Sequence, residues 1–291
     1  MTEEKTDRLV RVLDWNRMDA EQRMGFRGGK YTDVNLWLSF FIGVIFWLLF
    51  YGSLMPVRDH YLGKFFMERS ITQYLSVFFT CWSAAILLLK WRKLVLQRKT
   101  LQLMIVPHSQ DFVLAPATAG DILRRMYDLV DDPKNFVLLN RTERALSNLS
   151  NIGLISDVSE MLRAQAENDE DHMESSYSMI KGFIWGIPVL GFIGTVLGLS
   201  QAIGQFSSVM AASDIISNLK TSLQGVTKGL STAFDTTLLA LVAALTIQLL
   251  LTALKKKEEY FLDECKDYCH ANIISKLRLI QTQPAQTEPS A

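Results

Sequence analysis

The chain has 291 residues, of which 49% are hydrophobic, and its 30 basic and 30 acidic residues give a formal net charge of zero. This balance gives no support to nucleic-acid binding, and three cysteines, an odd number, argue against a disulfide framework. These averages would also suit a soluble protein, but the distribution of charge would not. Long uncharged runs alternate with strongly charged ones, which is typical of a protein that crosses a lipid membrane several times.

Four apolar segments are long enough to cross a hydrocarbon core of about 30 Å as helices. In chain order they comprise residues 34–55, 71–89, 182–206 and 230–254. The first segment is too long for the apolar part of a secretory signal peptide, and it has no small-residue cleavage site. The sequence therefore predicts an all-α membrane protein with four transmembrane helices, the first two of them within residues 34–89.

The basic residues indicate how these helices are oriented. They cluster before the first segment, after the second, before the third and after the fourth, and include Arg23, Arg27, Lys30, Lys90, Arg92, Lys93, Lys181, Lys255, Lys256 and Lys257. Lysine and arginine are enriched in cytoplasmic loops. Both termini, and the block between the second and third segments, are therefore predicted to lie in the cytoplasm.

That block, residues 90–181, is predicted to be a small helical domain. Helical patterning appears near residues 122–130 and 143–166, and Asp131-Asp132-Pro133 predicts a break between them. The acidic run at residues 167–171 is expected to form a solvated surface or turn.

The remaining segments complete the predicted domain order. Residues 1–33 form a cytoplasmic N-terminal segment, and residues 182–254 form a core of two transmembrane helices. Apolar residues at helical spacing over residues 215–230 predict an amphipathic helix at the outer surface that leads into the last transmembrane helix. Residues 255–280 are expected to extend that helix into the cytoplasm, and the polar tail at residues 281–291 is expected to be disordered.

The sequence contains no soluble-enzyme signature, and we expect neither catalysis nor a cofactor. A phosphate-binding loop, a nucleophile elbow and a His-Glu-x-x-His zinc motif are all missing from it. Cys265, Cys269 and His270 could offer two or three zinc ligands, but no second cluster completes a site. No metal site is therefore predicted.

Small residues form a stripe on each of the last two transmembrane helices. On the third helix the stripe contains Gly191, Thr195, Gly198 and Ala202, and on the fourth it contains Ala233, Thr237, Ala240, Ala244 and Gln248. Two such faces can approach closely, either each other or a third helix. Spacing alone favours simple tight packing, with the threonine hydroxyls bonded to their own helix backbone. A polar pathway along the stripes is the alternative.

Asp235 is the ionisable residue between Lys228 and Lys255. A carboxylate inside a bilayer marks an ion pathway or a buried pair by default. Asp235 lies near the outer end of its helix, however, and Lys228, seven residues earlier on the same face, could pair with it. Asp235 and Thr237 lie roughly 200° apart around the helix, so both cannot line one narrow pore.

Two stretches of the sequence resemble a known family. The third helix contains Ile187-Pro-Val-Leu-Gly-Phe-Ile-Gly-Thr-Val-Leu-Gly-Leu199, which resembles the Pro-x-Leu-Gly-x-x-Gly-Thr-Val-x-Gly signature of the MotA/TolQ/ExbB proton-channel family. The stretch Gly229-Leu-Ser-Thr-Ala-Phe-Asp-Thr-Thr-Leu-Leu-Ala-Leu-Val-Ala-Ala244 resembles that family's last transmembrane helix. The resemblance covers mainly residues 180–260.

The resemblance implies a stator-like subunit of a molecular motor in the bacterial inner membrane. Five copies of such a subunit surround two copies of a single-span partner of the MotB, TolR or ExbD type, and a membrane aspartate of the partner takes the proton. Threonines of the last two helices line the ion path, and by position these are Thr195 and Thr237. Ion flow through such homopentamers drives rotation or force in processes that range from flagellar rotation to uptake and protein transport.

Three positions depart from the family pattern. Thr232 replaces a membrane glutamate of TolQ-like and ExbB-like chains, and Thr246 replaces a proline that many members have. Asp235 occupies a position that is usually apolar in TolQ-like and ExbB-like chains. An extra carboxylate beside hydroxyls could favour sodium, so the transported ion is expected to be a proton or sodium.

These features assign roles to nine residues. We expect Thr195, Thr237, Asp235, Thr232 and Thr236 in the ion pathway, Pro188 at a bend in the third helix, and Gly191, Gly194 and Gly198 in helix packing. Two rival interpretations remain. A non-conducting membrane scaffold would use the stripes only for assembly, and a small-solute transporter would need a polar pocket or broken helices near the membrane midplane.

Overall fold

The computed structural model describes residues 13–26, 28–67, 70–103, 105–106, 113–149, 155–210 and 215–278. Within these ranges the chain is helical, apart from loops and two isolated bridges, Leu13 with Val130 and Leu114 with Leu277. Four helical stretches are long and apolar enough to cross a membrane. They comprise Leu36–Val57, Ile71–Gln102, Ile155–Ser207 and Leu223–Lys276. The predicted fold class is therefore confirmed: the chain is an all-α, multi-pass membrane protein.

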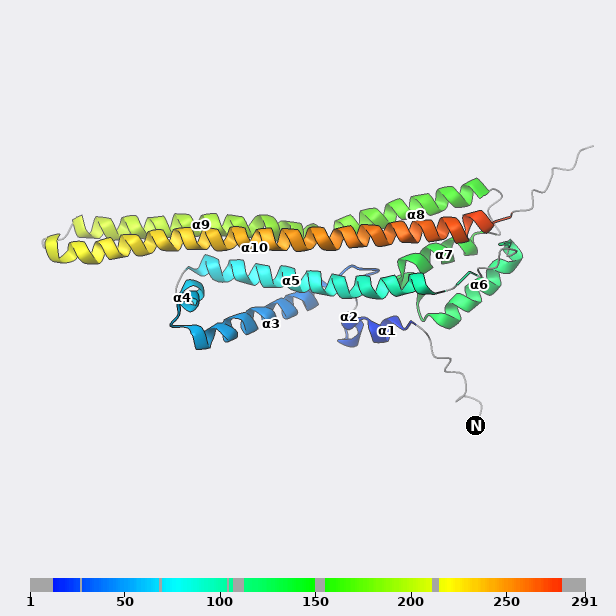
Figure 1. The fold of residues 1–291 in the computed structure, drawn as a ribbon, viewed down its shortest axis with the longest axis horizontal. Coiled ribbons are helices and arrows are strands. Elements are labelled where there is room, and N and C mark those ends of the chain that lie inside the picture. The colour runs from blue at the N-terminus through cyan, green and yellow to red at the C-terminus, as the bar shows by residue number, and fades with distance from the viewer. Residues whose placement is uncertain are drawn as a thin grey trace, which may run out of the picture. The chain divides into compact units, whose positions relative to one another are not determined.

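The helices follow one another along the chain as drawn in Figure 1. The α-helices are α1 (Trp15–Met18), α2 (Ala20–Arg23), α3 (Leu36–Leu54), α4 (Tyr61–Met67), α5 (Ile71–Arg98), α6 (Pro116–Leu129), α7 (Val137–Ser147), α8 (Ile155–Ser176), α9 (Ser178–Met210) and α10 (Ile215–Asn272). Short 3-10 helices are η1 (Met55–Val57), η2 (Lys99–Gln102), η3 (Pro133–Asn135) and η4 (Ile274–Lys276).

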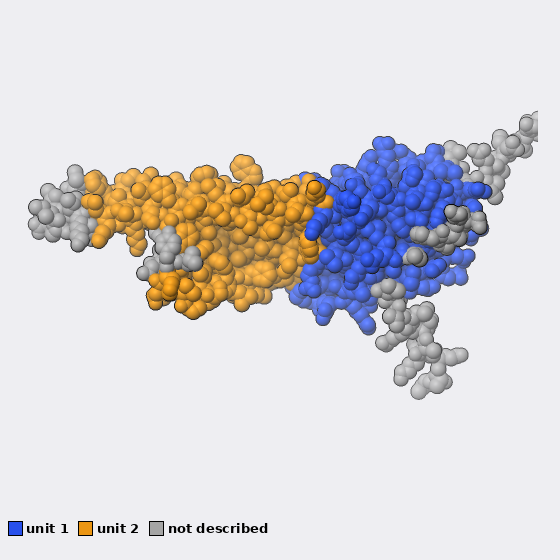
Figure 2. All heavy atoms as spheres, in the orientation of Figure 1, with its two compact units in different colours: residues 1–33, 92–175, 257–291 blue, residues 34–91, 176–256 orange. Residues whose placement is uncertain are grey.

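The chain divides into two compact units, coloured separately in Figure 2. Unit 1 comprises residues 1–33, 92–175 and 257–291, and unit 2 comprises residues 34–91 and 176–256. Both α5 and α10 contribute residues to each unit. Unit 2 contains most of the apolar helical sequence, whereas unit 1 contains the shorter amphipathic helices.

Aromatic side chains pack α3 against α5 in unit 2, where Figure 1 shows the two helices side by side. Asn35 caps the start of α3, because its side chain accepts hydrogen bonds from the backbone of Trp37 and Leu38. A Cβ atom on Gly43 would lie 2.8 Å from Trp82 Cα, so the two backbones are close there. Trp82 Nε1 donates to Ser39 Oγ at 3.1 Å. The ring of Trp82 also lies 4.8 Å from that of Phe183, which brings α9 into the same packing.

The core of unit 1 is built around α7, which is buried over most of its length. Trp15 packs edge-on against Phe136 with ring centroids 5.1 Å apart, and this contact holds α1 to the start of α7. Lys93 of α5 is 2% exposed and forms an ion pair of 2.6 Å with Glu21. Such a buried pair costs desolvation, so its role is to fix where the N-terminal segment docks on α5 rather than to add net stability.

Several sequence predictions require correction. Residues 215–230 are the first turns of α10 and not a separate interfacial helix, and no proline interrupts the helix before the last apolar segment. The helix expected at residues 143–166 is two helices, α7 and α8. The second apolar segment continues past residue 89 to Arg98 as α5.

Within the acidic run at residues 167–171, which was expected to be solvated, Asp169 is buried in an ion pair with Arg141. The break at Asp131-Asp132-Pro133 does separate α6 from α7. The disordered tail predicted at residues 281–291 and the first part of the predicted N-terminal segment, residues 1–12, lie outside the described residues.

Candidate functional site

The helices α9 and α10 pack in direct backbone contact within unit 2, and Figure 1 shows them side by side. A Cβ atom added to Gly191 would lie 2.7 Å from Ala240 Cβ. One added to Gly198 would lie 2.7 Å from Gly229 O. Real Cβ atoms do not approach other atoms so closely, so these positions accept no larger residue without a shift of the helices. The buried alanines Ala202 and Ala233 continue the same contact.

Gly194 lies in this contact as well, but it faces polar atoms. Its added Cβ would lie 2.6 Å from Thr236 Oγ1 and 2.8 Å from Thr72 Oγ1. Two hydroxyls from α10 and α5 therefore converge on one glycine of α9. The three glycines expected in helix packing, Gly191, Gly194 and Gly198, all lie against α10.

Thr232 and Thr236 are buried inside the protomer, with exposed fractions of 8% and 2%. Thr236 Oγ1 donates to the carbonyl oxygens of its own helix at Thr232 and Ala233, both at 3.0 Å. Thr232 Oγ1 likewise donates to Lys228 O at 2.9 Å. These two residues, which the sequence assigns to the ion pathway, line the packed side of α10 in the protomer.

Thr72 joins this cluster, and sequence reasoning missed it. Its side chain is buried, and its Oγ1 has no hydrogen-bond partner among the described residues. An unsatisfied hydroxyl in a membrane segment is costly and needs a reason. The sequence offers one signal, a threonine at the start of an apolar segment, but no spacing rule connects residue 72 with residues 194 and 236.

Thr237 lies at one edge of the α9–α10 contact and is half-buried. Its Oγ1 lies 3.1 Å from Gly191 O of α9 and 3.3 Å from Ala233 O of its own helix. The hydroxyl therefore bridges the two helices. Both oxygens belong to backbone carbonyls, so the contact does not depend on the identity of other side chains.

Thr195 is also half-buried, one helical turn after Gly191. Its Oγ1 donates to Phe192 O of its own helix at 2.6 Å. This is the backbone bond that simple packing predicts. The hydroxyl oxygen keeps acceptor capacity beyond this bond, so Thr195 can still receive a hydrogen bond from water or from another chain.

Asp235 is half-buried on the opposite edge of α10 from Thr237. Consecutive residues of a helix are turned by about 100°, so Asp235 and Thr237 are turned from Thr236 in opposite directions. Since Thr236 faces the packed side, Asp235 and Thr237 flank that side on opposite edges. Asp235 Oδ2 accepts a hydrogen bond from Ser231 Oγ at 3.2 Å. The structure therefore brings Thr237 to Gly191 and keeps Asp235 away from them.

Pro188 lies within α9, and the helix continues on both sides of it. Proline cannot donate the backbone hydrogen bond that would normally reach the fourth preceding carbonyl. The neighbouring Ile187 is fully buried against Ala240 and Ala244 of α10. Packing against α10 thus supports α9 where its own hydrogen-bond ladder is interrupted.

The cysteine and histidine positions do not combine into a metal centre in the part of the chain that the structure describes. Cys265 and Cys269 are buried in unit 1, and His270 is exposed.

Comparison with known proteins identifies a family. The model of the MotA/TolQ/ExbB proton channel family matches residues 138–266, which confirms the family resemblance that the sequence predicts. The matched region contains α8, α9 and most of α10. No curated protein and no solved structure matches the chain.

Proposed function

Because residues 138–266 belong to the MotA/TolQ/ExbB proton channel family, we propose that the chain is the channel subunit of a membrane complex driven by an ion gradient. The subunit conducts protons or sodium ions together with a single-span partner, and the complex converts ion flow into rotation or force. The observation that carries this proposal is the family match, because it includes both α9 and α10.

The proposed ion path runs along the half-exposed edge of the α9–α10 contact. Thr237 lies at this contact and Thr195 lies one helical turn after Gly191, and their hydroxyls can bind water or coordinate a cation. Tight glycine packing supports the path, because it fixes the positions of the two helices and therefore of both hydroxyls.

A titratable carboxylate is needed for proton transfer, and the transmembrane part of α9 contains none. The transmembrane part of α10 contains Asp235, which lies on the opposite edge from Thr237. We therefore assign the proton-accepting carboxylate of the central path to the partner. Asp235 then tunes the outer end of the path or an interface with the next subunit.

The complex is proposed to contain five copies of this chain around two copies of the partner. It lies in the bacterial inner membrane, with both termini in the cytoplasm. The clusters of lysine and arginine beside the apolar segments support this orientation. The half-exposed hydroxyls at the edge of each α9–α10 pair support a lining built from several copies.

Replacing Thr195 with valine tests the path. Valine keeps the shape of threonine and removes the hydroxyl, so ion flux should fall severalfold while assembly with the partner is unchanged. Flux is measured in liposomes that contain the chain and its partner, under an imposed gradient. Thr195→Ser, which keeps the hydroxyl, is the matched control and should retain flux. Full flux through Thr195→Val would remove this residue from the path.

A non-conducting scaffold is the second candidate, because Thr195 Oγ1 already bonds to its own helix. If the chain is a scaffold, neither Thr195→Val nor Thr195→Ser changes ion flux or assembly with the partner. A solute transporter receives less support, because the transporter expectation rests on broken helices and α9 is continuous through Pro188.

A further inference from the structure

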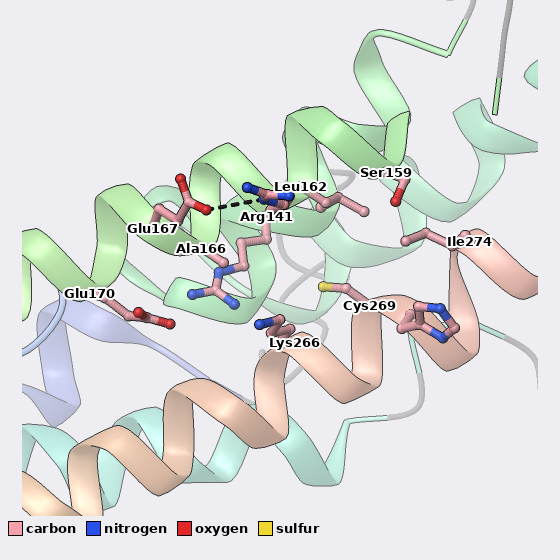
Figure 3. A pocket seen from close by; sticks show the side chains of 11 residues that line it. Arg141, Ser159, Leu162, Ala166, Glu167, Glu170, Lys266, Cys269 and Ile274 are labelled. Atoms are coloured by element: carbon pink, nitrogen blue, oxygen red, sulfur yellow. Dashed lines mark hydrogen bonds and ion pairs between the residues drawn. The ribbon is translucent and has the colours of Figure 1, made fainter. Parts of the chain in front are cut away.

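Unit 1 contains a cavity of about 500 Å³ whose lining comes from α7, α8 and the C-terminal part of α10. Figure 3 shows Arg141 and Lys266 approaching it from different helices. Cavities of roughly 300–1,000 Å³ are the size that holds small organic ligands. This cavity lies outside the membrane segments 182–206 and 230–254, so the proposed ion path does not account for it.

Arg141 is the buried charge in this cavity, with an exposed fraction of 1%. Its Nε donates to Asp169 Oδ2 at 2.7 Å. Its Nη2 has no hydrogen-bond partner among the described residues. A guanidinium carries five donors in a planar fork, and a buried donor without a partner costs about 1–3 kcal/mol. Asp169 therefore satisfies one side of the fork and leaves another side free for a ligand.

The other charges of the lining balance, because Arg163 and Lys266 carry two positive charges and Glu167 and Glu170 carry two negative ones. Glu167 already accepts a hydrogen bond from Arg163 at 3.1 Å, so these two charges offset each other. Lys266 adds a second positive charge from α10 and offsets Glu170. Arg141 Nη2 is then a buried donor of the site without a partner among the described residues.

The rest of the lining contains the polar residues Ser159 and His270 and an apolar wall. Leu162 and Ala166 of α8 and Ile274 beyond α10 contribute hydrocarbon surface. Cys269 also lines the cavity, but it is 3% exposed and offers a small apolar surface. A polar end and an apolar wall together fit a molecule with one charged group and a hydrocarbon body.

We propose that this cavity is a binding site for a small organic anion whose carboxylate or phosphate group binds Arg141 Nη2, with Lys266 as the second cation. A planar guanidinium matches the oxygens of either group. The apolar body of the ligand lies against Leu162 and Ile274. The site joins α7, α8 and α10 within unit 1, so the ligand would hold these three helices together.

The test measures binding by isothermal titration calorimetry on the full chain in detergent. The probes are phenyl phosphate and benzoate, which share an aromatic body and differ in the anionic group. Benzyl alcohol, which has no charge, and sodium chloride at matched ionic strength are the ligand controls. Saturable binding of phenyl phosphate or benzoate, with none for benzyl alcohol, is the expected result.

Two variants separate this site from other binding. Lys266→Gln removes an exposed charge, and Arg141→Lys keeps a cation beside Asp169 but removes the planar fork. Each should weaken the binding of the anion about tenfold or more, since a hydrogen bond to a charged group is lost. Lys134→Gln, an exposed lysine of η3 in the same unit, is the matched control and should bind normally.

The outcomes are distinct. Binding of only phenyl phosphate or only benzoate supports the site and identifies the group it accepts. Binding that both cavity variants retain, or that Lys134→Gln loses equally, overturns the proposal. Lack of saturable binding by either anion overturns it too, and would assign Arg141 Nη2 to water. Neither result affects the ion-channel proposal, which rests on α9 and α10.

Discussion

At the scale of single residues, buried polar groups of unit 1 have specific partners. The phenol of Tyr31 accepts a hydrogen bond from Asn140 Nδ2 at 2.6 Å in unit 1. Burial, followed by the negative charge of Asp169, raises the pKa of Tyr31 to about 12. Tyr31 is therefore neutral at physiological pH. The charge of Asp169 is balanced by the ion pair with Arg141.

Replacing Asp169 with asparagine should destabilise unit 1 strongly. The change leaves Arg141 buried without a counter-charge, and breaking one side of a buried pair costs about 3–5 kcal/mol. Thermal unfolding in detergent should show a markedly lower Tm. Glu167→Gln, on the exposed face of the same helix, should leave Tm unchanged, because the pair of Arg163 with Glu167 is solvated. Equal Tm values for the two variants would contradict the structural role of Asp169.

Threonine positions could be predicted at this scale only in part. The sequence shows threonines in the last two transmembrane helices, because a polar residue is conspicuous in an apolar run. It could not separate buried Thr236 from half-exposed Thr237, because the rotation of a helix that is apolar on all sides depends on its neighbours. Lys93 shows the same limit: its buried partner Glu21 is 72 residues away along the chain.

The close contact of α9 and α10 is the main feature at the scale of elements. Gly198 of α9 and Gly229 of α10 oppose each other, and a Cβ on either would lie within 3 Å of the other's carbonyl oxygen. A backbone oxygen cannot move aside as a flexible side chain can. Any added methyl group must therefore separate the helices.

Replacing Gly198 with alanine should lower the stability of unit 2 by about 1–3 kcal/mol, the usual cost of overpacking. The control is Gly186→Ala on the same helix, where a Cβ would meet no atom within 4 Å. That change should leave Tm equal or higher, since alanine favours a helix over glycine. Thermal unfolding of both variants in one detergent measures the difference. A Gly186→Ala protein that unfolds earlier than Gly198→Ala would refute this packing.

Sequence reasoning located the apolar helices well, because their length and lack of charge depend on local composition alone. It placed an extra interfacial helix before the last of them, since amphipathic spacing is equally compatible with the continuous helix α10. It treated residues 167–171 as one solvated run. In a helix, however, residues three or four apart share a face, and Asp169 lies on the buried face of α8 with Ala166 and Met173. These errors arise where packing between distant segments decides the outcome.

At the scale of the whole molecule, the chain has two units that share the helices α5 and α10. The α10 helix contributes residues to both units. The apolar side chains exposed on α9 and α10 include Phe192, Val196 and Phe234. A single protomer leaves them uncovered, and lipid, a partner helix or a neighbouring copy would bury them.

Native mass spectrometry of the complex released from membranes tests the proposed assembly. We expect a mass that corresponds to five copies of the 33.0 kDa chain with two copies of a smaller partner. A dimer or a monomer without a second polypeptide would contradict this assembly. Gly186→Ala serves as the control variant and should give the same mass as the wild type.

Ion flux tests the central claim most directly. The chain and the single-span protein that co-purifies with it are reconstituted in liposomes, and proton and sodium movements are followed under an imposed gradient. Flux that requires both proteins, and that falls when Thr195 is replaced by valine, is the expected result. Complete complexes that pass neither ion above the level of empty liposomes would contradict the account.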